Sequence, residues 1–174
     1  MSAPDGALAD AKAYLRIDGT DEDALLDTLI GAALDLCERF TGLALFASAR
    51  TAMLEAVTRC WQRLPATPVT AISGVSGVDA TGVATALPVE DYAIDIDAAG
   101  DGWVRLTAGI AQHRIAIAYQ AGLAADWPSL PEPLRQGALR LVAHLHAHRD
   151  AGDDAGPPAA VAALWRPFRR MRLS

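Results

Sequence analysis

The amino-acid sequence has few cysteines, few aromatic residues and no long apolar run. Two of the 174 residues are cysteine, and aromatic residues make up 6%. Because Cys37 and Cys60 both lie in apolar stretches, we expect buried free thiols in a reducing compartment. No apolar run approaches the roughly 18 residues of a membrane span. The N-terminal MSAPDGALADAK also does not have the basic and then apolar order of a signal peptide. We therefore expect no membrane partner.

The sequence also contains no signature of catalysis or cofactor binding. The glycines are scattered and form neither GxGxxG nor GxxxxGK[ST], and no serine lies in a nucleophile elbow. His144 and His148 have the i, i+4 spacing of a zinc pair. However, Leu145 stands where a metalloprotease has glutamate, and no third ligand is evident. These observations predict that the chain is not an enzyme and holds no cofactor and no metal.

The acids at residues 91–97 and the histidines leave a small enzyme open as a further hypothesis. Asp91, Asp95 and Asp97 alternate with apolar residues, which is typical of the solvated face of a strand. The acidic residues 150, 153 and 154 do not have the spacing of a calcium loop. An enzyme could use Asp91, Asp95 and Asp97 or the histidines, and a metal analysis of the purified protein would test it.

Charge is unevenly distributed along the chain. There are 21 acidic and 15 basic residues, for a formal net charge of −6. No acid follows Asp154, while Arg166, Arg169, Arg170 and Arg172 lie close to the C-terminus. Without these four arginines the net charge would be −10. The body is therefore expected to repel nucleic acid, whereas the tail can bind an acidic partner.

Residues 20–42 predict one helix with both ends marked. Thr20 is in N-cap position with Asp23 three residues later, and Gly42 follows where a left-handed cap would end the helix. One apolar stripe runs from Leu25 to Phe40, and Leu26, Ile30 and Leu34 form a second one. A helix that is apolar on two sides needs two partners. The second partner is either more core or a neighbouring subunit.

The remaining pattern predicts an α+β fold. A helical core, made of a long N-terminal helix and C-terminal helices, would carry a small inserted antiparallel sheet. The helices are expected at about 7–42 and 131–149, and the sheet at about 45–122, with a hairpin turn at residues 79–82. We expect residues 1–150 to form one domain and residues 151–174 a linker with a C-terminal docking segment.

The C-terminal WRPFRRMRL interleaves aromatic residues with arginines. This composition is suited to stacking and to charge-assisted pairing with acidic protein or with phosphate. Pro167 should end or kink the preceding helix near Arg166. Two further interpretations stay open: a terminal helix packed on its own domain, and a nucleic-acid-binding module that acts through this basic tail.

The order of elements and four segments resemble the head–tail connector (adaptor) proteins of long-tailed phages and of phage-like gene transfer agents. The segments lie at residues 8–42, 64–75, 130–150 and 159–173, so the resemblance covers nearly the whole chain. They read LADAKAYLRIDGTDEDALLDTLIGAALDLCERFTG, LPATPVTAISGV, LPEPLRQGALRLVAHLHAHRD and AAVAALWRPFRRMRL. The first and third are fairly specific in combination.

The resemblance implies a structural protein of the particle neck, made in the bacterial cytoplasm. It implies a ring of twelve subunits that joins the portal to a stopper or another tail-side protein, with DNA passing through the lumen without specific binding. The helix at residues 20–42 would contribute subunit contacts, through Leu26, Ile30 and Leu34. The C-terminal segment would reach the portal, through Trp165, Arg166, Phe168, Arg169, Arg170, Met171, Arg172 and Leu173.

Overall fold

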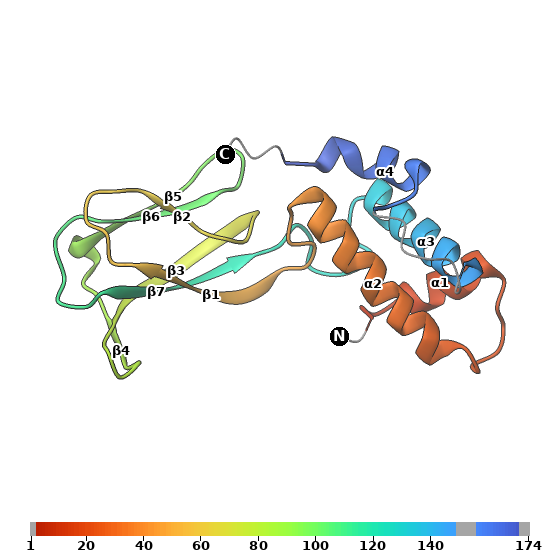
Figure 1. Ribbon diagram of the computed structural model, residues 1–174, viewed down its shortest axis with the longest axis horizontal. Helices are drawn as coiled ribbons and strands as arrows, with labels where there is room; N and C mark the ends of the chain where they lie inside the picture. The colour runs from red at the N-terminus through yellow and green to blue at the C-terminus, as the bar shows by residue number, and fades with distance from the viewer. Residues whose placement is uncertain (1–2, 149–155, 171–174) are drawn as a thin grey trace. The chain divides into compact units, whose positions relative to one another are not determined.

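A computed structural model describes residues 3–148 and 156–170 of the chain. The chain divides into two compact units. Residues 1–45 together with 124–174 form a helical unit, and residues 46–123 form a sheet unit (Figure 1). The described part of the chain contains no helix long and apolar enough to cross a membrane.

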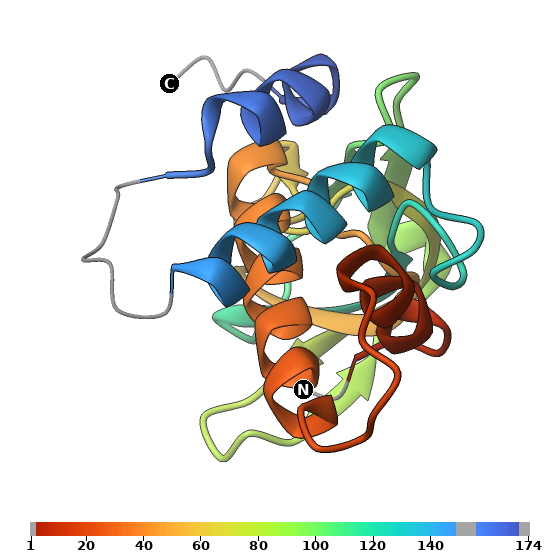
Figure 2. The same ribbon diagram turned by 90° about the vertical axis from the view of Figure 1, so that its right-hand side faces the viewer.

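Four helices and one short 3-10 turn make up the described part of the helical unit. They are α1 (Ala7–Leu15), α2 (Asp23–Thr41), α3 (Glu132–Ala147), α4 (Ala159–Trp165) and the turn η2 (Arg166–Phe168). Figure 2 shows α3 lying over α2, with α1 and α4 on either side of α3. The helices bury alanines together with a few large side chains, such as Leu26, Leu141 and Trp127.

The ends of the helices agree only in part with the sequence signals. Gly42 ends α2 as expected, with φ of 75° and its N–H donating to the Glu38 carbonyl. The expected N-cap at Thr20 is wrong, because α2 begins at Asp23 and Glu22 precedes it without a side-chain cap. Pro131 directly precedes α3, which also begins without a side-chain cap. Proline fixes φ near its helical value, so it can begin a helix without a side-chain cap.

Seven strands form two antiparallel sheets in the sheet unit. The four-stranded sheet has the order β1-β7-β3-β4, and the three-stranded sheet has the order β2-β6-β5. Their bounds are Ser48–Glu55 (β1), Gln62–Arg63 (β2), Val69–Val78 (β3), Ala84–Ala86 (β4), Tyr92–Ile96 (β5), Gly102–Leu106 (β6) and Arg114–Ala121 (β7), with a 3-10 turn η1 at Val89–Asp91. The predicted hairpin is confirmed, because β3 and β4 pair on either side of residues 79–83.

The two sheets bury their inner side chains against each other. Val75, Ile117 and Tyr119 come from the four-stranded sheet, and Val104 and Leu106 come from β6 of the other. Alternation along β7 produces this arrangement, since every second residue of that strand is buried. The outward residues of each strand therefore remain as candidate contact surfaces.

The predicted fold class is wrong. The N-terminal region forms two separate helices, α1 of 9 residues and α2 of 19, not one long helix that organises the chain. The strands are not a small insertion in a helical core, because seven of them form two sheets with a core of their own. Two facing sheets bury apolar residues between themselves and so need no helical support for that purpose.

Candidate functional site

The C-terminal segment packs on its own helical unit as far as the structure describes it. Trp165, the last residue of α4, is fully buried, and its Nε1 donates to the Leu134 carbonyl at 3.3 Å. Its ring centroid lies 6.0 Å from that of Phe40. Gly137 makes room for the indole, since a Cβ at this position would lie 2.1 Å from Nε1. Trp165 therefore anchors the segment to α2 and α3.

The residues after Trp165 hold positive charge close to the end of α2. Arg169 lies over the Phe40 ring, 5.6 Å from its centroid, and the Arg170 N–H donates to the Thr41 carbonyl at 2.9 Å. Arg166 and Arg169 are exposed, and Phe168 is half-buried. Met171, Arg172 and Leu173 lie outside the described residues. The predicted portal-docking role of this segment stays a prediction.

The apolar stripe that was predicted to meet a neighbouring subunit lies inside the helical unit. Leu26, Ile30 and Leu34 are only 0%, 2% and 3% exposed. On the other stripe of α2, Leu25 and Leu29 are half-buried. The chain's own packing thus accounts for the burial of the first three residues, and their part in a subunit contact stays a prediction.

The histidines of α3 contact each other and one acid. The rings of His144 and His148 stack at 4.4 Å between centroids, and His146 Nε2 lies 3.0 Å from Glu22 Oε2. Among residues 3–148 and 156–170 there is no group of three histidine, cysteine or acidic side chains placed to hold a metal ion. The contact between His146 and Glu22 joins α3 to the start of α2.

Asp97, in the turn after β5, has structural partners. Asp97 Oδ1 accepts from the Ala99 and Asp101 N–H groups at 2.9 Å, and Oδ2 accepts from Trp103 Nε1 at 3.0 Å. Asp97 therefore closes the turn between β5 and β6. Asp95 is exposed, Asp91 is half-buried, and neither forms an ion pair with another described residue.

Lowered pKa values also mark turns and helix starts. A hydrogen bond from the Thr81 hydroxyl, assisted by backbone N–H groups, lowers the pKa of Asp79 in the turn after β3. The pKa of Asp126 is lowered mainly by the Ser129 side chain, and that of Glu132 mainly by Arg135. Each partner lies within four residues of its acid, so the shifts have a local cause.

The sequence interpretation missed a surface on the outer side of the three-stranded sheet. The strand pairing places Trp103 and Arg63 side by side on that side, and Arg105 lies over the Trp61 ring at 4.9 Å. Trp61 is 45% exposed. We call Trp61, Arg63, Trp103 and Arg105 the Trp61 face. The segment RCWQR at residues 59–63 interleaves arginine and tryptophan as the C-terminal segment does, and this signal could have indicated the face.

The cysteine prediction is correct for one thiol only. Cys37 is fully buried in α2, and burial raises its pKa to about 12, with a smaller contribution from Glu38. Cys60 is exposed, because it lies outside the strands, between Arg59 and the Trp61 face. Arg59 has φ of 62°, so the chain turns just before Cys60. Both cysteines are free.

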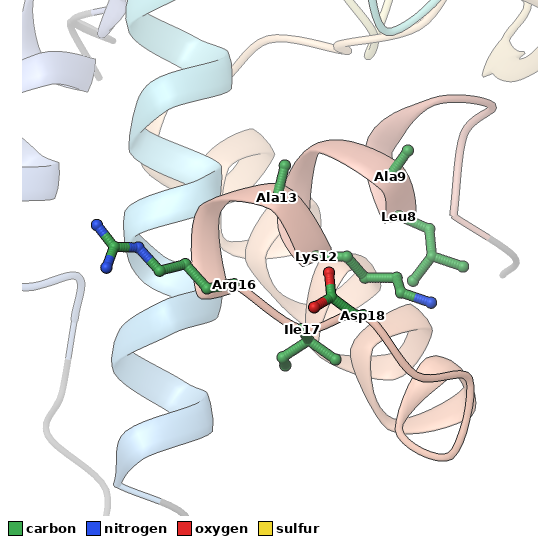
Figure 3. A pocket seen from close by; sticks show the side chains of 7 residues that line it. All are labelled: Leu8, Ala9, Lys12, Ala13, Arg16, Ile17 and Asp18. Carbon is green, nitrogen blue, oxygen red and sulfur yellow. The ribbon is translucent and has the colours of Figure 1, made fainter.

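A hollow surface lies along α1. We call it the α1 groove; it has a volume of about 700 Å³ and is lined by Leu8, Ala9, Lys12, Ala13, Arg16, Ile17 and Asp18. In Figure 3, Lys12 and Arg16 extend in opposite directions from the helix. Lys12 is neutralised by Asp23, whose Oδ1 lies 2.7 Å from Nζ. Asp18 forms no ion pair with another described residue. The groove therefore combines an apolar lining with one acid open for a partner.

Comparison with known proteins identifies relatives across nearly the whole chain. The family model described as head completion protein matches residues 7–154. No curated protein matches the chain.

Three solved structures of gene transfer agent particles contain similar chains. In the neck of an empty particle, computed with C6 symmetry, the similar chain is 26% identical with a TM-score of 0.80. In the virion of the native particle the values are 27% and 0.77. In the neck of the native particle, computed with C12 symmetry, they are 27% and 0.74. Each alignment covers 100% of this chain and 95% of the other.

Proposed function

The chain belongs to the head completion protein family, and from this premise we propose that it forms a homo-oligomeric ring in the neck of a phage or gene transfer agent particle. The family and the neck structures indicate a structural, non-enzymatic component of the head–tail connection. In our proposal the ring has twelve subunits and joins the portal to a stopper or another tail-side protein. DNA passes through its lumen.

The observation that carries this proposal is the match over the full length of this chain to chains in symmetric necks. The alignment leaves no part of this chain uncovered, at 26% to 27% identity. Necks computed with C6 and C12 symmetry support a closed ring. Such a ring uses two unlike patches on each subunit, because each copy contacts one neighbour with one patch and the next neighbour with the other.

Particle imaging tests the ring and its position together. Particles that carry a tagged copy of this chain should show a ring of tagged density between the portal and the tail. Particles with a complete neck from which the chain is absent would contradict the proposal.

We infer that the C-terminal segment makes the portal contact. The anchor at Trp165 and the hydrogen bond from Arg170 to Thr41 hold the base of the segment, so Arg166 and Arg169 are presented to solvent from a fixed point. Fixing the cations in advance lowers the entropy lost on binding an acidic surface. In this version of the proposal Trp165 positions the segment, and the residues from Arg166 onward contact the portal.

Charge reversal tests the portal contact without removing the buried anchor. The double variant Arg166→Glu and Arg169→Glu should lose co-sedimentation with the portal. The matched control is Arg114→Glu with Arg140→Glu, which reverses two exposed arginines elsewhere and should bind as the wild type does. Equal binding by both double variants would remove the C-terminal segment from the portal contact.

The charge of the chain fits a lumen that does not retain DNA. The formal net charge is −6, and the basic residues of the tail are the exception to an acidic body. Binding to duplex DNA relies on neutralising phosphates with Lys and Arg. A gel shift at moderate salt should therefore show no complex. Salt-dependent binding that falls with each tail arginine removed would instead favour the alternative function, a nucleic-acid-binding module.

A further inference from the structure

The Trp61 face has a cation with no acidic partner among the described residues. Arg105 lies over the Trp61 ring and forms no ion pair with another described residue. Its Nε is shielded from solvent and has no hydrogen-bond partner among the described residues. The neighbouring Arg63 pairs with Asp101 at 2.9 Å, which leaves the charge of Arg105 uncompensated. An exposed tryptophan beside an arginine without an acidic partner has the composition of a protein-binding surface.

The chemistry of the face specifies what that protein must provide. Tryptophan and arginine are among the residue types most enriched at the centres of protein interfaces. The partner needs an apolar hollow for the indole and a carboxylate for the guanidinium. Asp95 is exposed on β5 in the position opposite Trp103, so a cation on the partner would complete the match.

The α1 groove provides these features. Leu8, Ala13 and Ile17 contribute apolar lining, and a volume of about 700 Å³ is of the size that accepts small organic groups. Asp18 is exposed and unpaired among the described residues, so it can accept from Arg105. Arg16, which extends away from Lys12 in Figure 3, is exposed and can meet Asp95. The face and the groove therefore have complementary charges, with an apolar lining available for the indole.

We propose that the Trp61 face of one copy binds the α1 groove of a second copy of this chain. The inference rests on the proposed ring, which requires two unlike and complementary patches on every subunit. Trp61 enters the groove, and Arg105 pairs with Asp18 of the second copy. Since the face belongs to the sheet unit and the groove to the helical unit, the contact joins unlike units of successive copies.

The chain contains a chemical handle for testing the contact. Cys60 is exposed and precedes Trp61, whereas Cys37 is buried with a pKa of about 12 and resists a thiol reagent at neutral pH. A maleimide–benzophenone should thus label Cys60 alone, and Cys60→Ser gives the unlabelled control. Protein that carries the cross-linker is mixed with ¹⁵N-enriched protein that does not carry it. The mixture is used in two forms, as concentrated purified protein and after assembly into particles. After irradiation, mass spectrometry locates the cross-links.

The expected result is cross-links between isotopically different copies that fall on residues 8–21. Cross-links between copies at other positions, cross-links confined to one copy, or cross-links only to a different neck protein would overturn the inference. The absence of any cross-link between copies would overturn it too.

Because tagged density in the neck is a separate readout, a chain that is present in the neck but cross-links elsewhere disproves this contact and leaves the proposed function intact. A chain absent from the neck disproves the function, and the concentrated protein then decides the contact.

Variants give an independent measure that does not depend on the label. Trp61→Ala should weaken association between copies at least about tenfold, as removal of a central interface tryptophan does. Arg105→Glu should weaken it similarly, and combining it with Asp18→Arg should recover most of the loss. Arg114→Glu, which reverses an exposed arginine on β7, is the matched control and should have no effect. Failure of the charge exchange to recover association, with both variants folded, would contradict the pairing.

Discussion

Gly137 has a packing role that its place in the middle of a helix would not suggest. Glycine is unfavourable there, but a Cβ would lie 2.1 Å from Trp165 Nε1. We predict that Gly137→Ala displaces the indole from its site and lowers the free energy of unfolding by about 1–3 kcal/mol, as overpacking does. Urea unfolding measures this effect. Gly19→Ala is the control, because nothing lies within 4 Å of the Cβ it would add. An equally stable Gly137→Ala protein would show that the anchor can shift without cost.

The two thiols should differ strongly in reactivity. For a pKa of about 12, only about one Cys37 side chain in ten thousand is ionised at pH 8, and the buried sulfur is also out of reach. We expect 5,5′-dithiobis(2-nitrobenzoate) to titrate one thiol in the native protein and two in denaturant. Cys60→Ser should reduce the native value to none. Rapid reaction of two native thiols would mean that α2 opens readily around Cys37.

At the scale of elements, a partly buried hydrogen bond joins α1 to the chain before α3. The Trp127 indole is 2% exposed, and its Nε1 donates to Asp10 Oδ2 at 2.8 Å. Asp10→Ala leaves that N–H without its acceptor, so we expect unfolding free energy to fall by about 1–3 kcal/mol. Asp10→Asn retains an acceptor and should lose less. Asp5→Ala removes an exposed acid and serves as the control. Equal stability of Asp10→Ala and Asp5→Ala would show that solvent replaces the bond.

Local signals predicted the elements better than their arrangement. Period-2 alternation located β5 because it depends only on neighbouring residues. The same alternation contains no information on which strands pair, so the division into two sheets that bury Val104 against Ile117 was missed. The N-cap at Thr20 failed for a related reason: residues 20–22 form a turn before α2, and tertiary packing sets where the helix begins.

For the contact surfaces, too, the sequence predicted local features better than their arrangement in space. Aromatic and arginine interleaving drew attention to Trp165, but the sequence could not show that Gly137 leaves room to bury it. Periodicity grouped Leu26 with Ile30 correctly, yet which of two apolar stripes faces the core depends on where α3 lies. The Trp61 face was missed because Arg105 and Trp61 are distant in sequence and meet only through the pairing of β2 with β6. A surface built from several strands can thus be recognised only once the pairing of the strands is known.

At the scale of the whole molecule, the two units have separate cores, and this should be visible in their stability. Ile117 is fully buried in the sheet unit, and Leu141 is 2% exposed in the helical unit. Replacing either by alanine should cost about 2–5 kcal/mol through lost burial and a residual cavity. Amide hydrogen exchange resolved by mass spectrometry should then show lost protection mainly in residues 46–123 for Ile117→Ala, and mainly in α2 and α3 for Leu141→Ala. If the two units are separately stable, a ring subunit can keep its helical contacts while its sheet unit adjusts to a partner. If instead either substitution lowers hydrogen-exchange protection equally in both units, they unfold as one cooperative body, and their stabilities are not independent.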